Sequence, residues 1–213
     1  MVVQLGENPW ILIGLITLEL LFIIIPALIF SKLERRPFQE IIKDMGFQEN
    51  ENLLIKLTAG LGFGILFFFI GNYIIVFFKD FIVRNLFSSR FVEFGKEGAI
   101  STEPIHPDII QLTIIIILNI LIIGPCEEAF FRGFLIKKFK TKLNLIFSII
   151  LSSLIFTLYH VPPILVPITT IITYSGYYLV FGVLLSLIFV YFEYSIIPCS
   201  IAHSCFNILI LLI

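Results

Sequence analysis

The sequence predicts an all-α fold, a polytopic transmembrane helical bundle with about six membrane helices and one short interfacial helix. Three observations support it. Hydrophobic residues make up 59% of the 213 residues and charged residues only 14%, and the mean hydropathy is +1.07, far from the balance of a soluble domain. Apolar runs recur at about the 20 residues that a spanning helix needs. Lys and Arg gather between those runs.

Six apolar runs are the candidate membrane helices. They span 10–30, 57–78, 109–136, 145–160, 168–192 and 197–213. The first run has no basic region before it and no small-residue cleavage site after it, so we interpret it as a permanent anchor rather than a signal peptide. In the second run, Gly60 and Gly64 form a GxxxG pair, which favours close approach of a neighbouring helix.

A short helix is expected between the first two runs, in the stretch RPFQEIIKDMGF. Its apolar residues Phe38, Ile41, Ile42 and Met45 follow helical spacing, with charged residues on the other side. This pattern is typical of a helix that lies on the membrane surface as an anchor.

The long segment 79–108 shows no sustained periodicity and contains two prolines, so we expect an extramembrane loop or a partial helix there. Four Lys or Arg lie in it, against five in 31–56 and five in 132–142. By the positive-inside rule, the two richer segments face the cytoplasm and the N-terminus faces outward.

Composition also excludes some classes of protein and site. The formal net charge is −1 and no basic tract stands out, so no nucleic-acid partner is expected. The three cysteines, Cys126, Cys199 and Cys205, lie in or beside apolar runs, where a thiol usually serves as a small hydrophobic side chain rather than half of a disulfide.

The stretch GPCEEAFFRGF places Glu127, Glu128 and Arg132 inside an apolar run. Left unpaired, three such charges in lipid would cost close to about 10 kcal/mol, so they must have partners. Glu128 and Arg132 are spaced i, i+4 with the acid first, the favoured geometry for an ion pair on one face of a helix. Glu127 points about 100° away and is left free to act as a general base. The alternative is a buried ion cluster without chemistry.

Two of the three histidines also lie in apolar runs. FTLYH places Phe156 and His160 one turn apart before the break VPP, and HSCFN places His203 and Asn207 on one helix face. A single histidine on an apolar helix is more often a satisfied core residue, but two of them with an Asn and a Glu pair favour an assembled site. The third histidine, His106, is expected to be solvated.

Three motifs therefore follow one another along the chain. They are EExxxR, FxxxH and HxxxN, at Glu127, Glu128 and Arg132, at Phe156 and His160, and at His203 and Asn207. Their order resembles the CAAX prenyl protease and bacteriocin-processing enzyme family, also called the Abi family, of intramembrane proteases. The resemblance covers roughly 110–211 and implies a protease-like catalytic core at 109–213, preceded by helices, interfacial helix and loop at 1–108, within a single integral membrane domain.

The resemblance implies an endopeptidase of the cell membrane that cuts near the C-terminus of a prenylated or hydrophobic peptide. Glu127 would deprotonate a water that His160 helps to hold, and Arg132 would keep Glu128 in place. His203 and Asn207 would donate hydrogen bonds to the developing oxyanion. Membrane lipid is the other expected partner, and the sequence leaves the oligomeric state open.

The same residues leave the metal question open, because Glu127, His160 and His203 are also a credible zinc set. The chain has no H-E-x-x-H motif, and Asn207 is a poorer zinc ligand than a histidine or a carboxylate. We therefore favour a mechanism without a cofactor, with zinc as the alternative.

One distance argues against the site. Counting helical rises from the cytoplasmic side places His160 about 24 Å deep and Glu127 about 15 Å deep, so upright helices would keep them apart. Helix tilt and the proline break after His160 would have to close the gap. Elsewhere, Glu19, Asn72 and Asn119 are expected to hydrogen-bond neighbouring helices, with a cavity position as the lesser alternative for Glu19.

Two other functions fit the polar cluster less well. A proton-coupled transporter would use Glu127 and His160 as a proton relay, but the sequence shows no inverted repeat. A non-catalytic bacteriocin-immunity protein would keep the pocket and act by binding.

Overall fold

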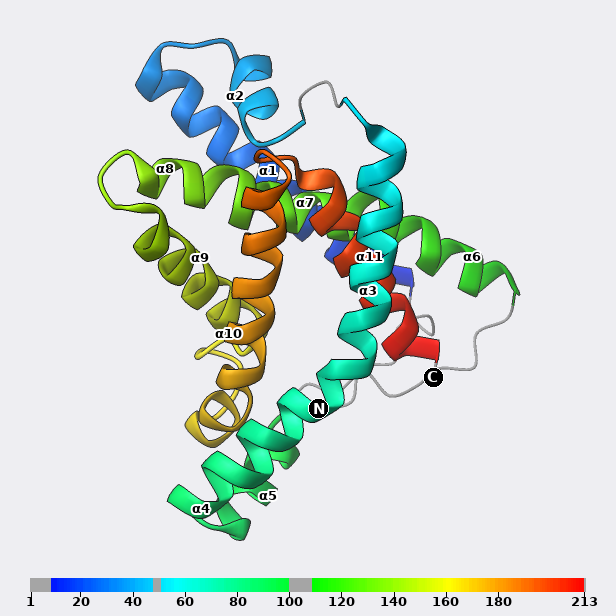
Figure 1. Ribbon diagram of the computed structural model, residues 1–213, viewed down its shortest axis with the longest axis vertical. Helices are drawn as coiled ribbons and strands as arrows, with labels where there is room; N and C mark the ends of the chain where they lie inside the picture. The colour runs from blue at the N-terminus through cyan, green and yellow to red at the C-terminus, as the bar shows by residue number, and fades with distance from the viewer. Residues whose placement is uncertain (1–8, 48–50, 100–108, 213) are drawn as a thin grey trace.

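The computed structural model describes residues 9–47, 51–99 and 109–212, and within these ranges it is a bundle of helices without a β-strand (Figure 1). This confirms the predicted all-α class. The elements that run before the long central helix are α1 (Pro9–Glu34), α2 (Phe38–Asp44), α3 (Leu53–Val76), η1 (Phe77–Val83), α4 (Arg84–Leu86) and α5 (Ser89–Glu97). After the central helix come α9 (Leu145–His160), α10 (Ile168–Tyr191) and α11 (Ile196–Leu212).

All six apolar runs form helices, but in the described residues four of the six, not all, have the length of a membrane span. Four stretches are long and apolar enough to cross a membrane: Ile16–Glu34, Leu53–Leu86, Leu112–Lys140 and Ile168–Tyr191. Two further apolar helices, α9 (Leu145–His160) and α11 (Ile196–Leu212), have 16 and 17 residues. At 1.5 Å per residue they fall short of a hydrocarbon core about 30 Å thick. These two shorter helices carry His160 and His203.

One continuous helix at 109–140 crosses the bundle. It consists of α6 (Ile109–Leu118), η2 (Asn119–Ile123), α7 (Gly124–Glu128), η3 (Ala129–Ile136) and α8 (Lys137–Lys140), of which η2 and η3 are π-helical. Figure 1 shows it lying at a steep angle to α3 and α10. The acidic pair of α7 therefore lies where the other helices cross it, between two π-helical segments, which are frequent at functional sites.

Small residues allow α3 to pack against α11. A Cβ added at Gly60 would lie 2.8 Å from the carbonyl oxygen of Pro198, and one at Gly64 would lie 2.6 Å from Cβ of Cys205. Both distances are shorter than contacts between real side chains. The GxxxG pair thus acts as predicted, since it brings the backbone of α3 against the helix that carries His203.

The short helix α2 forms as predicted, but its apolar side faces protein rather than lipid. Ile41 and Met45 are 2% and 1% exposed, and Gly133 of η3 lies directly beneath the Met45 backbone. Lys137 donates to the Asp44 carbonyl oxygen at 2.6 Å. The interfacial helix is therefore docked on the central helix, because a close-fitting glycine surface is available there.

The segment 79–99 is helical rather than a loop, which favours the partial-helix alternative. The helix of α3 continues through η1 and α4 to Leu86, and α5 then packs against α10, where Thr170 donates to the Gly95 carbonyl oxygen at 2.8 Å. Sequence periodicity missed this because π-helical η1 breaks the 3.6-residue repeat. His106, expected to be solvated, lies outside the described residues.

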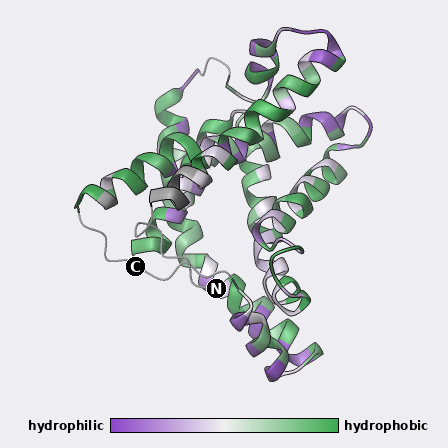
Figure 2. Ribbon diagram, turned by 180° about the vertical axis from the view of Figure 1, so that it is seen from behind, coloured by the Kyte–Doolittle hydropathy of each residue, from purple (hydrophilic) through white to green (hydrophobic). Residues whose placement is uncertain are grey.

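Charged residues gather at the two ends of the bundle, with apolar residues between them (Figure 2). The end of α1 and the end of the central helix meet at one of these ends, where Lys138 pairs with Glu34. The two segments richest in Lys and Arg thus share one end of the molecule, as the expected orientation requires.

Local sequence signals set the ends of α9. Asn144 caps its first turn, since its side chain accepts from the Phe147 backbone N–H at 3.0 Å. The helix stops at His160 because the residue before a proline is disfavoured in helical conformation, and Pro162 and Pro163 follow. His160 is therefore held at a helix end, with a short turn leading to α10.

Candidate active site

A buried ion pair lies at the centre of the site. Arg132 Nη1 donates to Glu128 Oε1 at 2.9 Å, and both side chains are essentially inaccessible. The pairing follows from the i, i+4 spacing, as predicted. His203 Nδ1, 75 residues further along the chain, lies 2.8 Å from the same Glu128 oxygen. This contact joins α11 to the ion pair.

Arg132 also ties the central helix to two others. Its Nη2 donates to the Gly182 carbonyl oxygen of α10 at 3.3 Å, and its guanidinium carbon lies 4.3 Å from the centre of the Phe156 ring of α9. Cation–π contact stabilises a desolvated guanidinium. The EExxxR and FxxxH motifs therefore meet at Arg132, which explains the Phe of FxxxH as its stacking partner. The HxxxN motif joins them through the contact of His203 with Glu128.

Glu127 is the free carboxylate of the pair. It is 4% exposed, and its Oε2 has no hydrogen-bond partner among the described residues. His160 Nε2 and His203 Nε2 each lie 3.9 Å from this oxygen. A separation of 3.9 Å is too long for a direct hydrogen bond but leaves room for one atom that touches all three groups.

The tautomers of both histidines follow from their partners. His160 Nδ1 lies 3.0 Å from the Phe156 carbonyl oxygen, which can only accept, so Nδ1 carries the proton. His203 Nδ1 faces Glu128, which is held as a carboxylate by Arg132, and by the same argument it is the donor. In a neutral imidazole, Nε2 of each ring is then the acceptor, and both Nε2 atoms face Glu127. The oxyanion-donor roles of His203 and Asn207 stay predictions.

The depth difference between Glu127 and His160 disappears in the folded chain. The estimate from helical rise assumed that the helices stand parallel, but the central helix crosses the bundle steeply (Figure 1). Position along this helix is therefore not depth in the membrane. The three motifs converge because of a crossing angle that no local pattern encodes.

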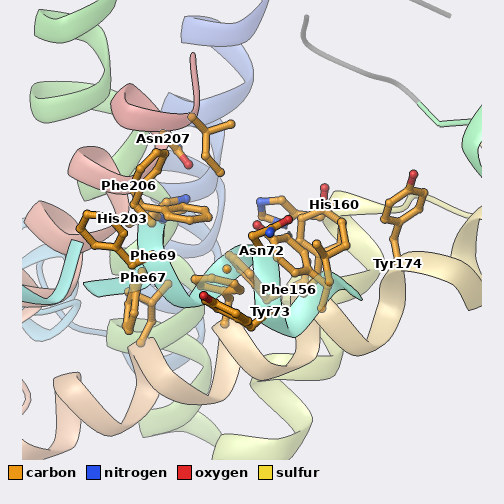
Figure 3. Close-up of a pocket in the computed structure, with 18 residues that line it drawn as sticks. Phe67, Phe69, Asn72, Tyr73, Phe156, His160, Tyr174, His203, Phe206 and Asn207 are labelled. Carbon is orange, nitrogen blue, oxygen red and sulfur yellow. Dashed lines mark hydrogen bonds between the residues drawn. The ribbon is translucent and has the colours of Figure 1, made fainter. Parts of the chain in front are cut away.

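A cavity of about 730 Å³ opens beside the two histidines. Figure 3 shows His203 and Asn207 from α11, His160 and Phe156 from α9, and Asn72 and Tyr73 from α3 around it. Sequence reasoning missed the α3 wall altogether. The only signal for it was Asn72, a polar residue in an apolar run, which we expected to hydrogen-bond another helix and which lines the cavity instead.

Two other polar residues were predicted to bond neighbouring helices. Glu19 does so, since Tyr159 of α9 donates to its Oε1 at 2.9 Å, and its Oε2 is buried without a partner in the described part of the chain. Asn119 does not, because its amide donates to the Ile115 carbonyl oxygen one turn earlier in the same helix. The backbone carbonyl oxygen of Asn119 accepts a hydrogen bond from the Ser204 hydroxyl of α11 at 2.6 Å.

The residues at the centre of the site fit a metal ion geometrically. Glu127, His160 and His203 each offer one ligand atom, and these atoms all lie within 4.8 Å of one another. The Nδ1 atom of His160 contacts the Phe156 carbonyl oxygen, and that of His203 contacts Glu128. A backbone carbonyl or a carboxylate at the second ring nitrogen is the usual partner of a metal-bound histidine. The unpartnered Glu127 oxygen would complete a three-ligand set with an open position.

Comparisons with known proteins agree with the motifs. Residues 109–209 match the family described as type II CAAX prenyl endopeptidase Rce1-like, which confirms the family that the motifs resemble. An uncharacterized protein of Mycoplasma capricolum subsp. capricolum is 30% identical over 166 residues, covering 76% of this chain and 45% of that protein. The chain thus spans less than half the length of this relative. No solved structure matches this chain.

Proposed function

Residues 109–209 belong to the Rce1-like family of type II CAAX prenyl endopeptidases, and on that premise we propose that this membrane protein is an intramembrane endopeptidase. Its substrate is a peptide that carries a lipid or a hydrophobic segment, and its location is the cell membrane. The observation that carries the proposal is the buried, unpartnered oxygen of Glu127, which faces the Nε2 atoms of two histidines beside a cavity.

The proposed reaction begins with a water between Glu127, His160 and His203. Such a water would donate one hydrogen bond to the carboxylate and another to a histidine Nε2. Glu127 takes its proton as the oxygen attacks the carbonyl carbon of the peptide bond. The C–N bond then breaks, and the amine leaves with a proton returned by Glu127 or relayed through His160.

The remaining motif residues support that step. Asn207 is placed on the cavity wall one turn after His203 and would donate to the oxyanion that forms during attack. Glu128 and Arg132 do not reach the substrate in this proposal. They hold the His203 ring, since one Glu128 oxygen accepts from both Arg132 and His203, and they are therefore positioning residues.

We propose that the water is activated without a metal. Three glutamates are buried in the described residues, namely Glu19, Glu127 and Glu128. Of these, Glu127 is the one whose carboxylate lies 3.9 Å from both histidine Nε2 atoms, and as a zinc ligand it would not be free to act as the base. A zinc ion, if bound, would be held by Glu127, His160 and His203 and would acidify a bound water.

The test is cleavage of a farnesylated CAAX peptide by the full chain reconstituted in lipid vesicles. The parent is expected to cut it, and Glu127→Gln to lose at least about a hundredfold in kcat/KM, because the base is removed at nearly constant volume. Glu93→Gln, on the surface of α5, is the matched control and should retain full activity. No cleavage by the parent, or equal cleavage by Glu127→Gln, would overturn the proposal.

The metal question has its own test. Prolonged dialysis of the reconstituted protein against a strong chelator should leave activity unchanged, and metal analysis should find less than one zinc per chain. Activity that disappears with the chelator and returns with zinc would refute the metal-free mechanism but would leave the endopeptidase assignment intact.

A further inference from the structure

The cavity beside the two histidines is polar in places but uncharged. Ten of its 18 lining residues are Phe or Tyr, and its neutral hydrogen-bonding groups are Asn72, Asn207 and four tyrosine hydroxyls. Such groups can bind the N–H and C=O of an extended peptide. Aromatic faces bind apolar side chains or a lipid chain at the same time.

No lysine or arginine side chain of the described residues lines this cavity. All 14 Lys and Arg lie in the described ranges 9–47, 51–99 and 109–212, and none of them lines the cavity. Arg132 is the nearest in sequence to the site, but its guanidinium is occupied by Glu128 and the Gly182 carbonyl oxygen and is covered by Phe156. The described residues thus offer no lysine or arginine here to neutralise a carboxylate of the substrate, and the two histidines already face the Glu127 side chain.

The charges closest to the rim are already paired. Along α3 and η1, Lys79 lies one turn beyond the lining residue Ile75. Asp80 binds Lys79 at 3.6 Å and Arg84 at 2.6 Å. A substrate carboxylate that reached these cations would therefore have to displace Asp80.

The cavity opens on the lipid-facing side of α3. Phe69 and Tyr73 belong to its lining and are 65% and 76% exposed, on a helix long and apolar enough to span the membrane. A substrate that enters past these side chains comes from the apolar layer. Charged groups would pay a desolvation penalty on that route without gaining a partner at its end.

We propose, on the basis of the endopeptidase function above, that this site cuts within an uncharged hydrophobic stretch of its substrate and does not recognise a C-terminal carboxylate. The scissile bond therefore lies inside a segment that is neutral for about three residues on either side, a span of about 10 Å in an extended chain. Asn72, which the family match at 109–209 does not include, is the residue of α3 placed to bind the substrate backbone.

The experiment uses a matched pair of peptides with the reconstituted full chain. Both carry a farnesylated cysteine followed by three uncharged residues, and they differ only in ending as a free acid or as an amide. The inference predicts kcat/KM values for the amide within about threefold of those for the acid, or higher, because the cavity offers the acid no cation. A third peptide with aspartate two residues after the cut bond should be cut at least about tenfold more slowly.

A gain-of-function variant sharpens the test. Asn72→Lys places a cation on the cavity wall and should shift the preference toward the free acid by about tenfold, whereas Asn72→Leu should slow both peptides alike. Lys79→Gln should leave the acid-to-amide ratio of the parent unchanged.

The outcomes separate the two proposals. If the parent cuts the acid at least about tenfold faster than the amide, the carboxylate is recognised and this inference is overturned while the endopeptidase function stands. An acid-to-amide ratio of kcat/KM that falls in Lys79→Gln would identify Lys79 as the cation that binds the carboxylate, and it would also overturn this inference. If neither peptide is cut, the proposed function fails and this inference fails with it.

Discussion

Replacing Arg132 with glutamine should destabilise the protein far more than replacing an exposed arginine. Arg132 is 0% exposed and holds Glu128 at 2.9 Å and the Gly182 carbonyl oxygen at 3.3 Å. In Arg132→Gln, Glu128 keeps only His203 as a hydrogen-bonding partner, and its charge stays buried. The loss of stability therefore comes mainly from the Glu128 carboxylate, which stays buried without its ion-pair partner.

The expected magnitude follows from this burial. Breaking a buried ion pair by removing one partner costs about 3 to 5 kcal/mol. The lost cation–π contact with Phe156 at 4.3 Å adds roughly 1 to 2 kcal/mol for a desolvated arginine. Together these terms come to about 4 to 7 kcal/mol, which for a chain of this size corresponds to a fall in Tm of about 8 to 28 °C.

The assay is thermal unfolding of the purified protein in lipid nanodiscs, followed by exposure of its buried cysteines to a thiol-reactive dye. Arg90→Gln is the control, since Arg90 is exposed on α5 and stacks only over Phe94. The double variant Glu128→Gln, Arg132→Gln should recover part of the loss, because no unpaired charge remains. A fall in Tm of less than about 2 °C for Arg132→Gln would refute the buried-pair reasoning.

Two further predictions concern packing and a second buried carboxylate. Gly64→Ala should destabilise the bundle by about 1 to 3 kcal/mol, because its Cβ would lie 2.6 Å from that of Cys205. Gly62→Ala is the control, since Gly62 has open space around it, and it should be neutral or stabilising by up to about 1 kcal/mol. Equal Tm values for the two variants would contradict the close contact of α3 and α11. Tyr159→Phe should lower the free energy of unfolding by about 1 to 3 kcal/mol, because it removes the hydrogen-bond donor to buried Glu19. Tyr191→Phe, on the exposed surface, is the control and should cause no change. If Tyr159→Phe unfolds at the same temperature as the parent, this hydrogen bond is not needed for stability.

Much of the fold could be read from the sequence because the relevant signals are local. Apolar runs located the four helices of membrane length and the two shorter ones, α9 and α11, since lipid requires each spanning segment to satisfy its own backbone. The spacing of Glu128 and Arg132 predicted their ion pair, which the structure contains at 2.9 Å. Contacts one turn apart on a helix depend on helical geometry alone.

Other features depended on residues that are far apart in the chain. The apolar side of α2 is buried because Gly133 of η3 leaves space for the Met45 backbone, and hydropathy cannot distinguish a protein surface from a lipid surface. The helical character of 79–97 was obscured by the π-helical turns of η1. Asn72 looked like an interhelical hydrogen-bonder because the α3 wall of the cavity is not visible in any local pattern.

The sequence by itself determined which residues are available for chemistry, an all-helical membrane fold, and the pairing that leaves Glu127 as the free acid. Only the tertiary structure decided that His160 and His203 both come within 3.9 Å of that acid, and that Glu128 orients His203. The physical reason is that hydrophobicity and spacing act along one helix, whereas the angle at which helices cross is set by the small residues and side-chain shapes where they meet.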